Sequence, residues 1–484
     1  PPSCNSRSGG WGPMSRERVV VGVDVGTTSM KAAAFALNGR SVGEASVVTC
    51  WDVGSGGETD MDVDCLTSDF TDLVAELVET TGTQPIGIGI TGMAETGVVV
   101  DDHGAARHRA FAWFDQRGAA ELDDLPPSIR DAFAGATGLA LKAECSLSKL
   151  LWLQAQGFTI NAGDVWLNAQ EFLGFRLTGT RATEPSLASR TALWDQDGRP
   201  WTQALDLIGV SEDFIPPFVA AGTSLGVVGD GCPESMRGAV VTVTGHDHLV
   251  AAIGSGAVGS NQLFNSCGTA DVLVRSVPWV IDADARAQLV AGGLSVGRHA
   301  LGGHTAVLGA TRFGLVMERV MAMLGVHDHA QRAHMVDAWR NEGSGNEGSG
   351  NDVVSVSEPG GWVNEVRVSL HDTCSPNQVV AAAIDYGIHS MRGCLETMTS
   401  VTGPSDHVIA GGGWAQLDGV LRAKGSLLAD LSRSTVSQPG VRGAAAFAGI
   451  AAGMTDEELT RELGSRIQPP GQHPQQEKQK ETVS

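Results

Sequence analysis

Residues 19–31 read VVVGVDVGTTSMK, and this stretch decides the fold class. The β-branched run 19–25 predicts a buried strand. A turn at residues 26–28 leads into a second apolar run at residues 30–37, and the Asn-Gly pair at 38–39 is typical of a hairpin turn. The folded part of the chain is therefore expected to begin as a β-meander.

The next segments predict a helix and a further strand. Apolar residues recur at spacings of three and four from Leu66 to Val78, which places one apolar stripe on a helix. Residues 86–91 then return to a strand pattern. A strand, a hairpin, a helix and a strand in this order predict an α/β domain with a mixed sheet covered by helices.

The second half of the chain repeats this pattern. Residues 239–244 read AVVTVT and predict a strand, and two further strands are predicted on either side of the turn Cys267-Gly268-Thr269. Gly268 follows Gly26 by 242 positions (268 − 26), half of the 484 residues. We interpret this spacing as a weak internal duplication of two similar domains.

The predicted boundary between the two domains lies near Gly245. It gives an N-terminal domain at residues 17–244 and a C-terminal domain at residues 245–467. Residues 1–16 are interpreted as a disordered leader or tag remnant, and residues 468–484 as a disordered tail poor in core-forming side chains. Residues 341–350 repeat NEGSG twice, which predicts a long surface loop.

Composition excludes several classes of protein. Acidic residues number 55 against 33 Lys and Arg, and the resulting net charge of −22 argues against binding to nucleic acid or to an anionic membrane. No stretch approaches the roughly 18 apolar residues of a membrane span. The 8 cysteines are scattered without a C-x-x-C pair, and no secretory signal pattern is present, so we expect reduced thiols in a soluble, cytoplasmic protein.

The turn after the first strand has the residues of a phosphate site. Gly26 allows backbone N–H groups to approach a ligand, and Thr27, Thr28 and Lys31 add donors. Asp24, at the end of the strand, is suited to a magnesium ion or its waters. An ordinary hairpin is the alternative interpretation of these residues.

Two further glycine turns strengthen the phosphate hypothesis. The turn at Gly268 and Thr269 repeats the first one in the other half of the chain. Residues 408–411 predict a strand that meets a triple glycine, after which a helix is expected to run to about residue 431. Three adjacent glycines favour either close approach of a ligand or tight packing of strand against helix.

Six blocks of this sequence, in this order, resemble the motifs of the FGGY carbohydrate kinases, which belong to the actin-like ATPase superfamily. They are residues 24–31, residues 91–97 (TGMAETG), residues 112–117 (AWFDQR), residues 244–248 (TGHDH), residues 267–269 (CGT) and residues 411–416 (GGGWAQ). The resemblance implies two ribonuclease H-like domains with a ligand cleft between them. It also implies ATP and Mg²⁺ as cofactors, and a small sugar, ketose or polyol as substrate.

The resemblance further assigns roles to individual residues. Asp247 is expected as the general base that accepts the proton of the attacking hydroxyl, and Asp24 and Asp247 as the residues at the magnesium ion. The phosphates are expected at Gly26, Thr27, Thr28, Lys31, Gly268 and Thr269, the nucleoside at Gly412, Gly413 and Gln416, and the sugar at Glu95, Trp113, Asp115, Arg117, His246 and His248.

Alternatives remain open at this point. Asp115 and Arg117 could form only a structural ion pair. A non-catalytic actin-like ATP-binding regulatory protein is one alternative, although it would have no need of the sugar-side residues Glu95 and 113–117. A degenerate kinase that binds sugar without turnover is another, and a homodimer is left open. Residues 87–92 match the dinucleotide fingerprint G-x-G-x-x-G, but they lie within a predicted strand with no helix after them, so we reject a dehydrogenase.

Overall fold

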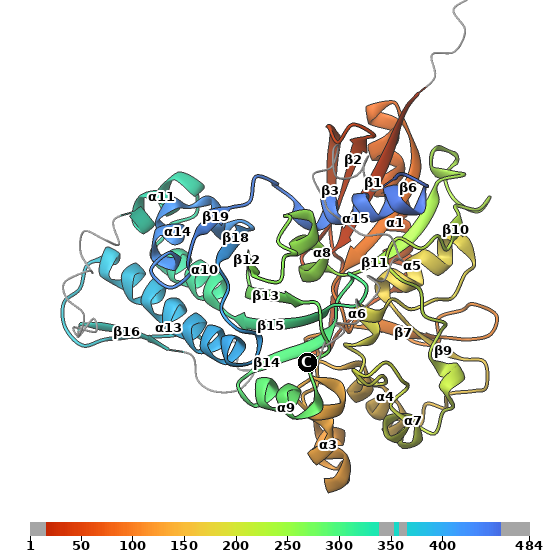
Figure 1. The fold of residues 1–484 in the computed structure, drawn as a ribbon, viewed down its shortest axis with the longest axis horizontal. Coiled ribbons are helices and arrows are strands. Elements are labelled where there is room, and N and C mark those ends of the chain that lie inside the picture. Colours follow the sequence, from red (N-terminus) through yellow and green to blue (C-terminus); the bar gives the residue numbers. More distant parts are fainter. Residues whose placement is uncertain (1–15, 338–352, 358–364, 456–484) are drawn as a thin grey trace, which may run out of the picture.

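The computed structural model describes residues 16–337, 353–357 and 365–455. Within these ranges the main strands form two six-stranded mixed sheets, one in each half of the chain (Figure 1). The predicted leader, apart from Arg16, lies outside the described residues, as do the repeat at 341–350 and the predicted tail. The predicted α/β class with two mixed sheets is confirmed.

The first sheet has the strand order β10-β11-β6-β1-β2-β3. Strands β1, β2 and β3 are antiparallel neighbours, and they form the predicted meander. Strands β6 and β11 continue the sheet in parallel with β1. The strands are β1 (Glu17–Val25), β2 (Ser29–Ala36), β3 (Ser41–Val48), β6 (Thr83–Gly92), β10 (Gly226–Val227) and β11 (Val240–His246).

The second sheet has the order β14-β15-β13-β12-β18-β19 and repeats the arrangement of the first. Strands β12, β13 and β15 are antiparallel neighbours, while β18 and β19 run parallel to β12. The strands are β12 (Gln262–Cys267), β13 (Asp271–Val277), β14 (Leu294–Arg298), β15 (Thr305–Thr311), β18 (His407–Gly411) and β19 (Leu431–Arg433). Each sheet thus places a hairpin turn, Gly26–Thr28 or Gly268–Thr269, beside the end of a parallel strand.

Helices cover both sheets. In the first half, α1 (Val63–Thr81) and α5 (Ala169–Thr178) share one apolar core with alternate residues of β1. Helices α8 (Asp247–Gly254) and α15 (Pro439–Ala451) pack on the opposite face of the same strand. In the second half, α10 (Phe313–Met323), α13 (Pro376–Thr402) and α14 (Asp418–Lys424) share a core with Cys267 and Ala410 of the sheet.

The remaining elements are short. The helices are α2 (Ala119–Asp123), α3 (Pro127–Thr137), α4 (Ser146–Ala155), α6 (Pro185–Ala188), α7 (Thr202–Leu207), α9 (Ala283–Ala291) and α11 (His329–Asp337), with 3₁₀ turns at Glu212–Phe214, Glu234–Met236 and Trp414–Gln416. The strands are β4 (Asp52–Val53), β5 (Thr59–Met61), β7 (Gly97–Val100), β8 (Ala110–Phe111), β9 (Val165–Asn168), β16 (Val354–Ser357) and β17 (Arg367–Leu370). No helix in the described part of the chain is long and apolar enough to cross a membrane.

One predicted helix is shorter than expected. The segment after the triple glycine forms a 3₁₀ turn and then α14, which ends at Lys424 instead of continuing to about residue 431. Leu431 already belongs to β19, which pairs with β18 in the sheet. Sheet pairing therefore overrides the apolar pattern of residues 425–430, which had favoured a longer helix.

The glycines of the false dinucleotide motif have a packing role. Helix α15 approaches the first sheet so closely that a Cβ atom on Gly89 would lie 2.0 Å from the carbonyl oxygen of Ala444, and one on Gly87 would lie 2.6 Å from that of Ala448. Gly22 on β1 is more crowded still, because its Cβ would lie 1.9 Å from the carbonyl oxygen of Val441. The last described helix thus returns to the first sheet, although it lies beyond the predicted boundary at Gly245.

We expect Gly22→Ala to lower the free energy of unfolding by about 1–3 kcal/mol, the usual cost of overpacking, since the new methyl group meets a main-chain carbonyl that cannot rotate away. Gly302→Ala is the matched control, because no described heavy atom lies within 4 Å of its Cβ position. Urea denaturation of both variants measures the difference. Equal stability of the two would contradict the close packing of α15.

Candidate active site

Asp24 lies at the carboxyl end of β1, directly before the first glycine turn. It is paired in register with Lys31 across the hairpin. Its Oδ1 atom is shielded from solvent and accepts no hydrogen bond from any described residue. A Cβ atom on Gly440, at the start of α15, would lie 2.8 Å from Asp24 Oδ2. A buried carboxylate oxygen without a partner, in space kept open by glycine, is the mark of a ligand position.

Asp247 is placed by the junction of β11 and α8. Gly245 has φ = 110°, and a Cβ atom there would lie 2.5 Å from Ser186 Oγ and 2.9 Å from Glu184 Oε2, so glycine is required at this turn. Because β1 and β11 run in the same direction in one sheet, their carboxyl ends meet at one edge. The topology therefore brings Asp24 and Asp247 together from distant parts of the chain.

The two aspartates have opposite pKa shifts. Burial, followed by the charge of Asp247, raises the pKa of Asp24 to about 7, against the opposing charge of Lys31. Burial acts to raise the pKa of Asp247 too, but His248, His246, the backbone N–H of His248 and Arg190 hold it below its ordinary value. Asp247 is therefore ionised at neutral pH, while Asp24 lacks a sufficient countercharge.

Two histidines flank Asp247. His246 Nε2 lies 3.2 Å from Asp247 Oδ1, and His248 Nε2 lies 4.0 Å from the same atom. Burial lowers the pKa of His246 to about 3, so this imidazole is neutral at pH 7. Its Nδ1 atom is buried and has no partner within the described ranges. His246, Asp247 and His248 could together offer three ligand atoms, all within 4.8 Å of one another, to a metal ion.

The residues present fit a magnesium ion. Mg²⁺ prefers carboxylate oxygens and retained waters to imidazole nitrogen. The unpartnered Asp24 Oδ1 offers such an oxygen. Burial and the charge of Asp247 raise the pKa of Asp24 in spite of Lys31, so the charged form of Asp24 is only partly compensated by the protein. Asp24, with Asp247 near it, is thus the better-suited set for a hard divalent cation.

Glu95 lies in the same neighbourhood and is held in a rare backbone conformation. Its φ is 65°, in the left-handed region, and its side chain is buried. Arg190 Nε donates to Glu95 Oε1 at 2.6 Å. Burial raises the pKa of Glu95, and the charges of Arg190, Asp247 and His248 all act on it. Strained backbone of this kind is concentrated at functional sites.

Two further polar atoms near Glu95 have no partner. Arg190 Nη1 and Glu144 Oε2 are both buried and make no hydrogen bond to a described residue. Burial, with the charge of Glu95 adding to it, raises the pKa of Glu144. Neither Arg190 nor Glu144 was predicted from the sequence, because each stands alone without a motif.

Trp113 connects the predicted sugar residues to the first phosphate turn. Its indole Nε1 donates to Thr27 Oγ1 at 2.9 Å, and its backbone N–H donates to Thr96 Oγ1 at 3.0 Å. The hydroxyl of Thr27 is therefore engaged by the tryptophan, and the ring is fixed beside the turn.

Asp115 and Arg117 bind each other, as the alternative interpretation allowed. Arg117 Nε and Nη2 donate to the two carboxylate oxygens of Asp115, each at 2.9 Å. Asp115 Oδ2 also accepts from the backbone N–H of Thr59 at 2.6 Å. Below them, the buried ammonium of Lys149 donates to the carbonyl oxygens of Asp115, Arg117 and Ala143. These contacts hold the loop that carries Trp113.

The predicted nucleotide residues form a second group, on the other sheet. Gly268 and Thr269 make the turn between β12 and β13, and Thr269 is exposed. Gly412 has φ = 100° and packs against this turn, since its Cβ would lie 2.6 Å from the carbonyl oxygen of Cys267. Gly413 and Gln416 are exposed beside it, with Gln416 Nε2 at 3.5 Å from the carbonyl oxygen of Gly412.

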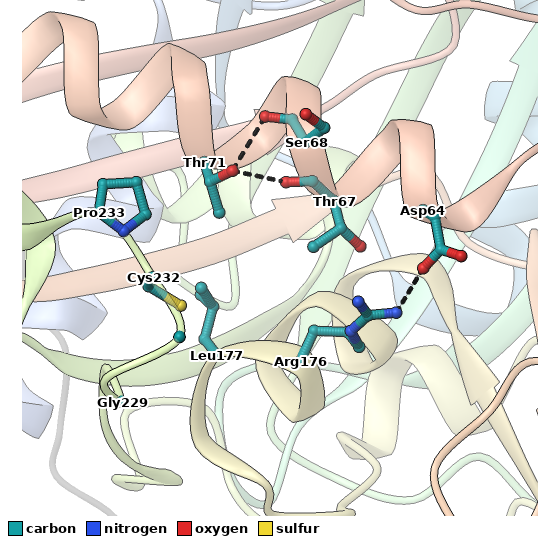
Figure 2. Close-up of a pocket in the computed structure, with 10 residues that line it drawn as sticks. Asp64, Thr67, Ser68, Thr71, Arg176, Leu177, Gly229, Cys232 and Pro233 are labelled. Carbon is teal, nitrogen blue, oxygen red and sulfur yellow. Dashed lines mark hydrogen bonds and ion pairs between the residues drawn. The ribbon is translucent and has the colours of Figure 1, made fainter.

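A cavity elsewhere in the first half contains none of the predicted site residues. It has a volume of about 400 Å³ and lies between α1, α5 and residues 229–233 (Figure 2). Figure 2 shows Arg176 directed at Asp64, and their ion pair measures 2.5 Å. The arginine is thus already paired within the wall of the cavity.

The fold and the site together define a class of protein. The chain has two similar mixed sheets, each with a glycine turn after its central strand, and a pair of aspartates at the strand ends. These features describe a two-domain protein of the actin-like α/β class. Residues 19–254 match the model of the FGGY family of carbohydrate kinases, N-terminal domain. Residues 19–254 therefore belong to the FGGY family of carbohydrate kinases.

Comparisons with individual proteins agree with this placement. The L-fuculokinase of Escherichia coli (strain K12) is 25% identical over 268 residues, which cover 54% of this chain and 57% of the relative. The chain thus spans about half the length of the curated relatives it matches. The solved gluconate kinase of Lactobacillus acidophilus has a TM-score of 0.80 at 16% identity, covering 93% of this chain and 92% of that one. Plasmodium falciparum glycerol kinase, solved with ADP, has a TM-score of 0.78 at 16% identity, covering 95% and 94%. At these identities the two structures establish the fold alone.

Proposed function

We propose that this protein transfers the γ-phosphoryl group of ATP to a hydroxyl of a small sugar, ketose or polyol. The observation that carries the proposal is the position of Asp247. An ionised, largely buried carboxylate lies at the strand edge of an FGGY domain, electrostatically coupled to Asp24 on one side and to the Glu95–Arg190 pair on the other.

Asp247 is the general base in this proposal. A sugar hydroxyl is a weak nucleophile, and a positioned carboxylate accepts its proton as the oxygen attacks phosphorus in line. The lowered pKa of Asp247 keeps the group deprotonated and ready at neutral pH. The glycine turns at residues 26–28 and 268–269 are proposed to hold the phosphate oxygens, on which negative charge is concentrated.

Asp24 and Asp247 would hold the magnesium ion. When bound, Mg²⁺ supplies positive charge to the phosphate oxygens of ATP. Lys31 faces Asp24 across the hairpin and adds a further cation at the same turn. Gly412, Gly413 and Gln416 are proposed to border the nucleoside, next to the second turn.

The sugar is proposed to bind between Trp113 and the Glu95–Arg190 pair. Carboxylates accept hydrogen bonds from sugar hydroxyls, a guanidinium donates them, and an aromatic ring covers the apolar face. The unpartnered atoms of Arg190, Glu144 and His246 are available for these bonds. Asp115 and Arg117 are proposed to support the loop, since their polar atoms bind protein groups.

We expect neutral polyols and ketoses to be preferred over aldonates such as gluconate by at least about tenfold in kcat/KM, a difference of ~1.4 kcal/mol. Glu95 interacts electrostatically with both Asp247 and Glu144, so three carboxylates lie close together at the proposed sugar site, whereas Arg190 is already paired with Glu95. A substrate carboxylate would therefore be repelled. Competition between xylitol and gluconate measures the preference, and Glu144→Gln should reduce it. Preference for gluconate would contradict the assigned charges.

A coupled ADP-release screen with ATP and Mg²⁺ tests the reaction. The panel contains glycerol, tetritols, pentitols, ketopentoses, ketohexoses and 6-deoxyketoses. Turnover with one group of these compounds would support the kinase and name its substrate class. ATP binding without turnover on any of them would favour the non-catalytic alternative, a nucleotide-dependent sugar-binding protein.

A further inference from the structure

A cluster of buried polar groups lies beneath the second phosphate turn. The ammonium of Lys424, at the end of α14, is fully buried. It donates to Asp271 Oδ1 at 2.6 Å, to Asn265 Oδ1 at 2.7 Å and to Cys267 Sγ at 3.2 Å. Asn265 Nδ2 also donates to Asp271 Oδ1, at 2.8 Å. We refer to Lys424, Asp271, Asn265 and Cys267 as the Lys424 cluster.

The Lys424 cluster holds both sides of the hairpin at its turn. Cys267 is the last residue of β12, Asp271 is the first residue of β13, and the two are paired in register. Gly268 and Thr269 lie between them. Because Lys424 binds both Cys267 and Asp271, it fixes the base of the turn. Lys424 lies on α14, the helix that follows the predicted nucleoside residues Gly412, Gly413 and Gln416.

The turn is also held from its other sides. Gly314, at the start of α10, lies so close that its Cβ would be 1.9 Å from the carbonyl oxygen of Gly268. Leu315 N donates to the carbonyl oxygen of Thr269 at 2.9 Å. Gly412 packs against Cys267. Small displacements of α14 would therefore be transmitted directly to the turn and to the glycines beside it.

The fold itself does not require a polar cluster here. In the first half of the chain, where Gly26 takes the place of Gly268, the residues that correspond to Asn265 and Cys267 are Val23 and Val25, counting back from each glycine. Both valines are fully buried in an apolar core. The same hairpin is thus built once with apolar side chains and once with a buried ion pair.

A buried ion pair is a poor choice for stability alone. Its desolvation offsets the attraction, and apolar replacements of similar volume are often equally stable. Asp271 Oδ2 is, in addition, buried without a partner among the described residues. Burial acts to lower the pKa of Lys424, but Cys267 and Asp271 hold this pKa above its ordinary value. Lys424 therefore stays protonated and positively charged. Directional bonds from a fixed charge define the geometry of the turn more narrowly than valines would.

We propose that Lys424 is a positioning residue for the nucleotide: it fixes the Gly268–Thr269 turn relative to Gly412 and Gly413, so that both segments close on one nucleoside triphosphate. The inference rests on the proposed function, because it concerns the ATP side of that site. Lys424 does not touch the nucleotide and acts through Cys267 and Asp271. The sugar side, which belongs to the other sheet, is independent of it.

The test separates positioning from stability with a double variant. Lys424→Met alone leaves Asp271 buried without its cation and lowers Tm. Lys424→Met combined with Asp271→Asn removes both charges, and we expect its Tm to return to within about 3 °C of the wild type. Calorimetric titration should nevertheless show ATP binding weakened at least about tenfold, and xylitol binding changed by less than about twofold.

A second buried lysine provides the control. Lys149→Met removes the cation beneath the Trp113 loop, so it should weaken xylitol binding by a larger factor than ATP binding, the reverse of the order expected for the Lys424 variants. If ATP affinity returns with Tm in the Lys424→Met/Asp271→Asn variant, the Lys424 cluster is only structural and the inference is overturned. If the wild type itself binds no ATP, the proposed function is overturned as well, which the wild-type titration shows separately.

Discussion

Asp247→Asn is expected to lower kcat by a factor of about 10² to 10⁴, the usual contribution of a general base. The amide has the shape of the carboxylate and can still accept the hydrogen bond from the backbone N–H of His248, which measures 2.6 Å. It cannot accept the proton of the attacking hydroxyl. The loss should appear in kcat at saturating sugar, measured by ADP release.

The exposed Asp230 provides a matched control for this substitution. Asp230→Asn removes the same charge from an exposed loop that contains none of the proposed site residues, and we expect unchanged kinetics. Thermal unfolding of both variants shows that the fold is kept. A folded Asp247→Asn protein that turns over at near the wild-type rate would overturn the assignment of the base.

The parts of the fold that local sequence dictates were predicted well. The β-meander follows from a β-branched run and glycine turns, and its first two strands form where the pattern places them, with the third strand directly after the predicted hairpin turn. The duplication was visible because two Gly-Thr turns follow similar strands. These signals work because they depend on neighbours in the chain, which sequence displays directly.

The parts that depend on distant contacts were not predicted. Arg190, Glu144, Lys149 and Lys424 are isolated charged residues with no motif around them, yet each makes its defining contact with a segment far away in the sequence or lies buried beside one. Lys149 gave the clearest signal, since it interrupts the apolar helix segment SLSKLLWLQA. A lysine within an apolar face indicates either a buried charge or a functional site.

The glycines divide in the same way. The sequence alone does not distinguish glycines that leave space for a ligand from glycines that allow a helix to pack closely against a sheet. Gly87 and Gly89 matched a nucleotide fingerprint but serve to admit α15, whereas Gly440 belongs to no motif and keeps the space beside Asp24 open. The difference depends on what a Cβ atom would meet, and only tertiary structure supplies that information.

Arg190→Met is expected to raise the KM for the sugar by about 10² to 10³, with a smaller effect on the KM for ATP. Arg190 Nε is bonded to Glu95 at 2.6 Å, and its Nη1 atom has no partner in the described part of the chain. The variant therefore loses a donor for the sugar and leaves Glu95 buried without its cation. Breaking a buried pair in this way also lowers the free energy of unfolding by about 3–5 kcal/mol, so stability has to be measured alongside the KM.

A double variant separates binding from folding in this case too. Arg190→Met combined with Glu95→Gln leaves no unpaired charge, so its stability should recover, but both polar partners of the sugar are altered and its KM should stay high. Arg107→Met is the control, because Arg107 pairs with the buried Asp164 in the same half of the chain. It should lower Tm without changing the KM for the sugar. A double variant with wild-type sugar KM would remove both Arg190 and Glu95 from the pocket, and the substrate would then have to be held by Trp113, Glu144 and the histidines beside Asp247.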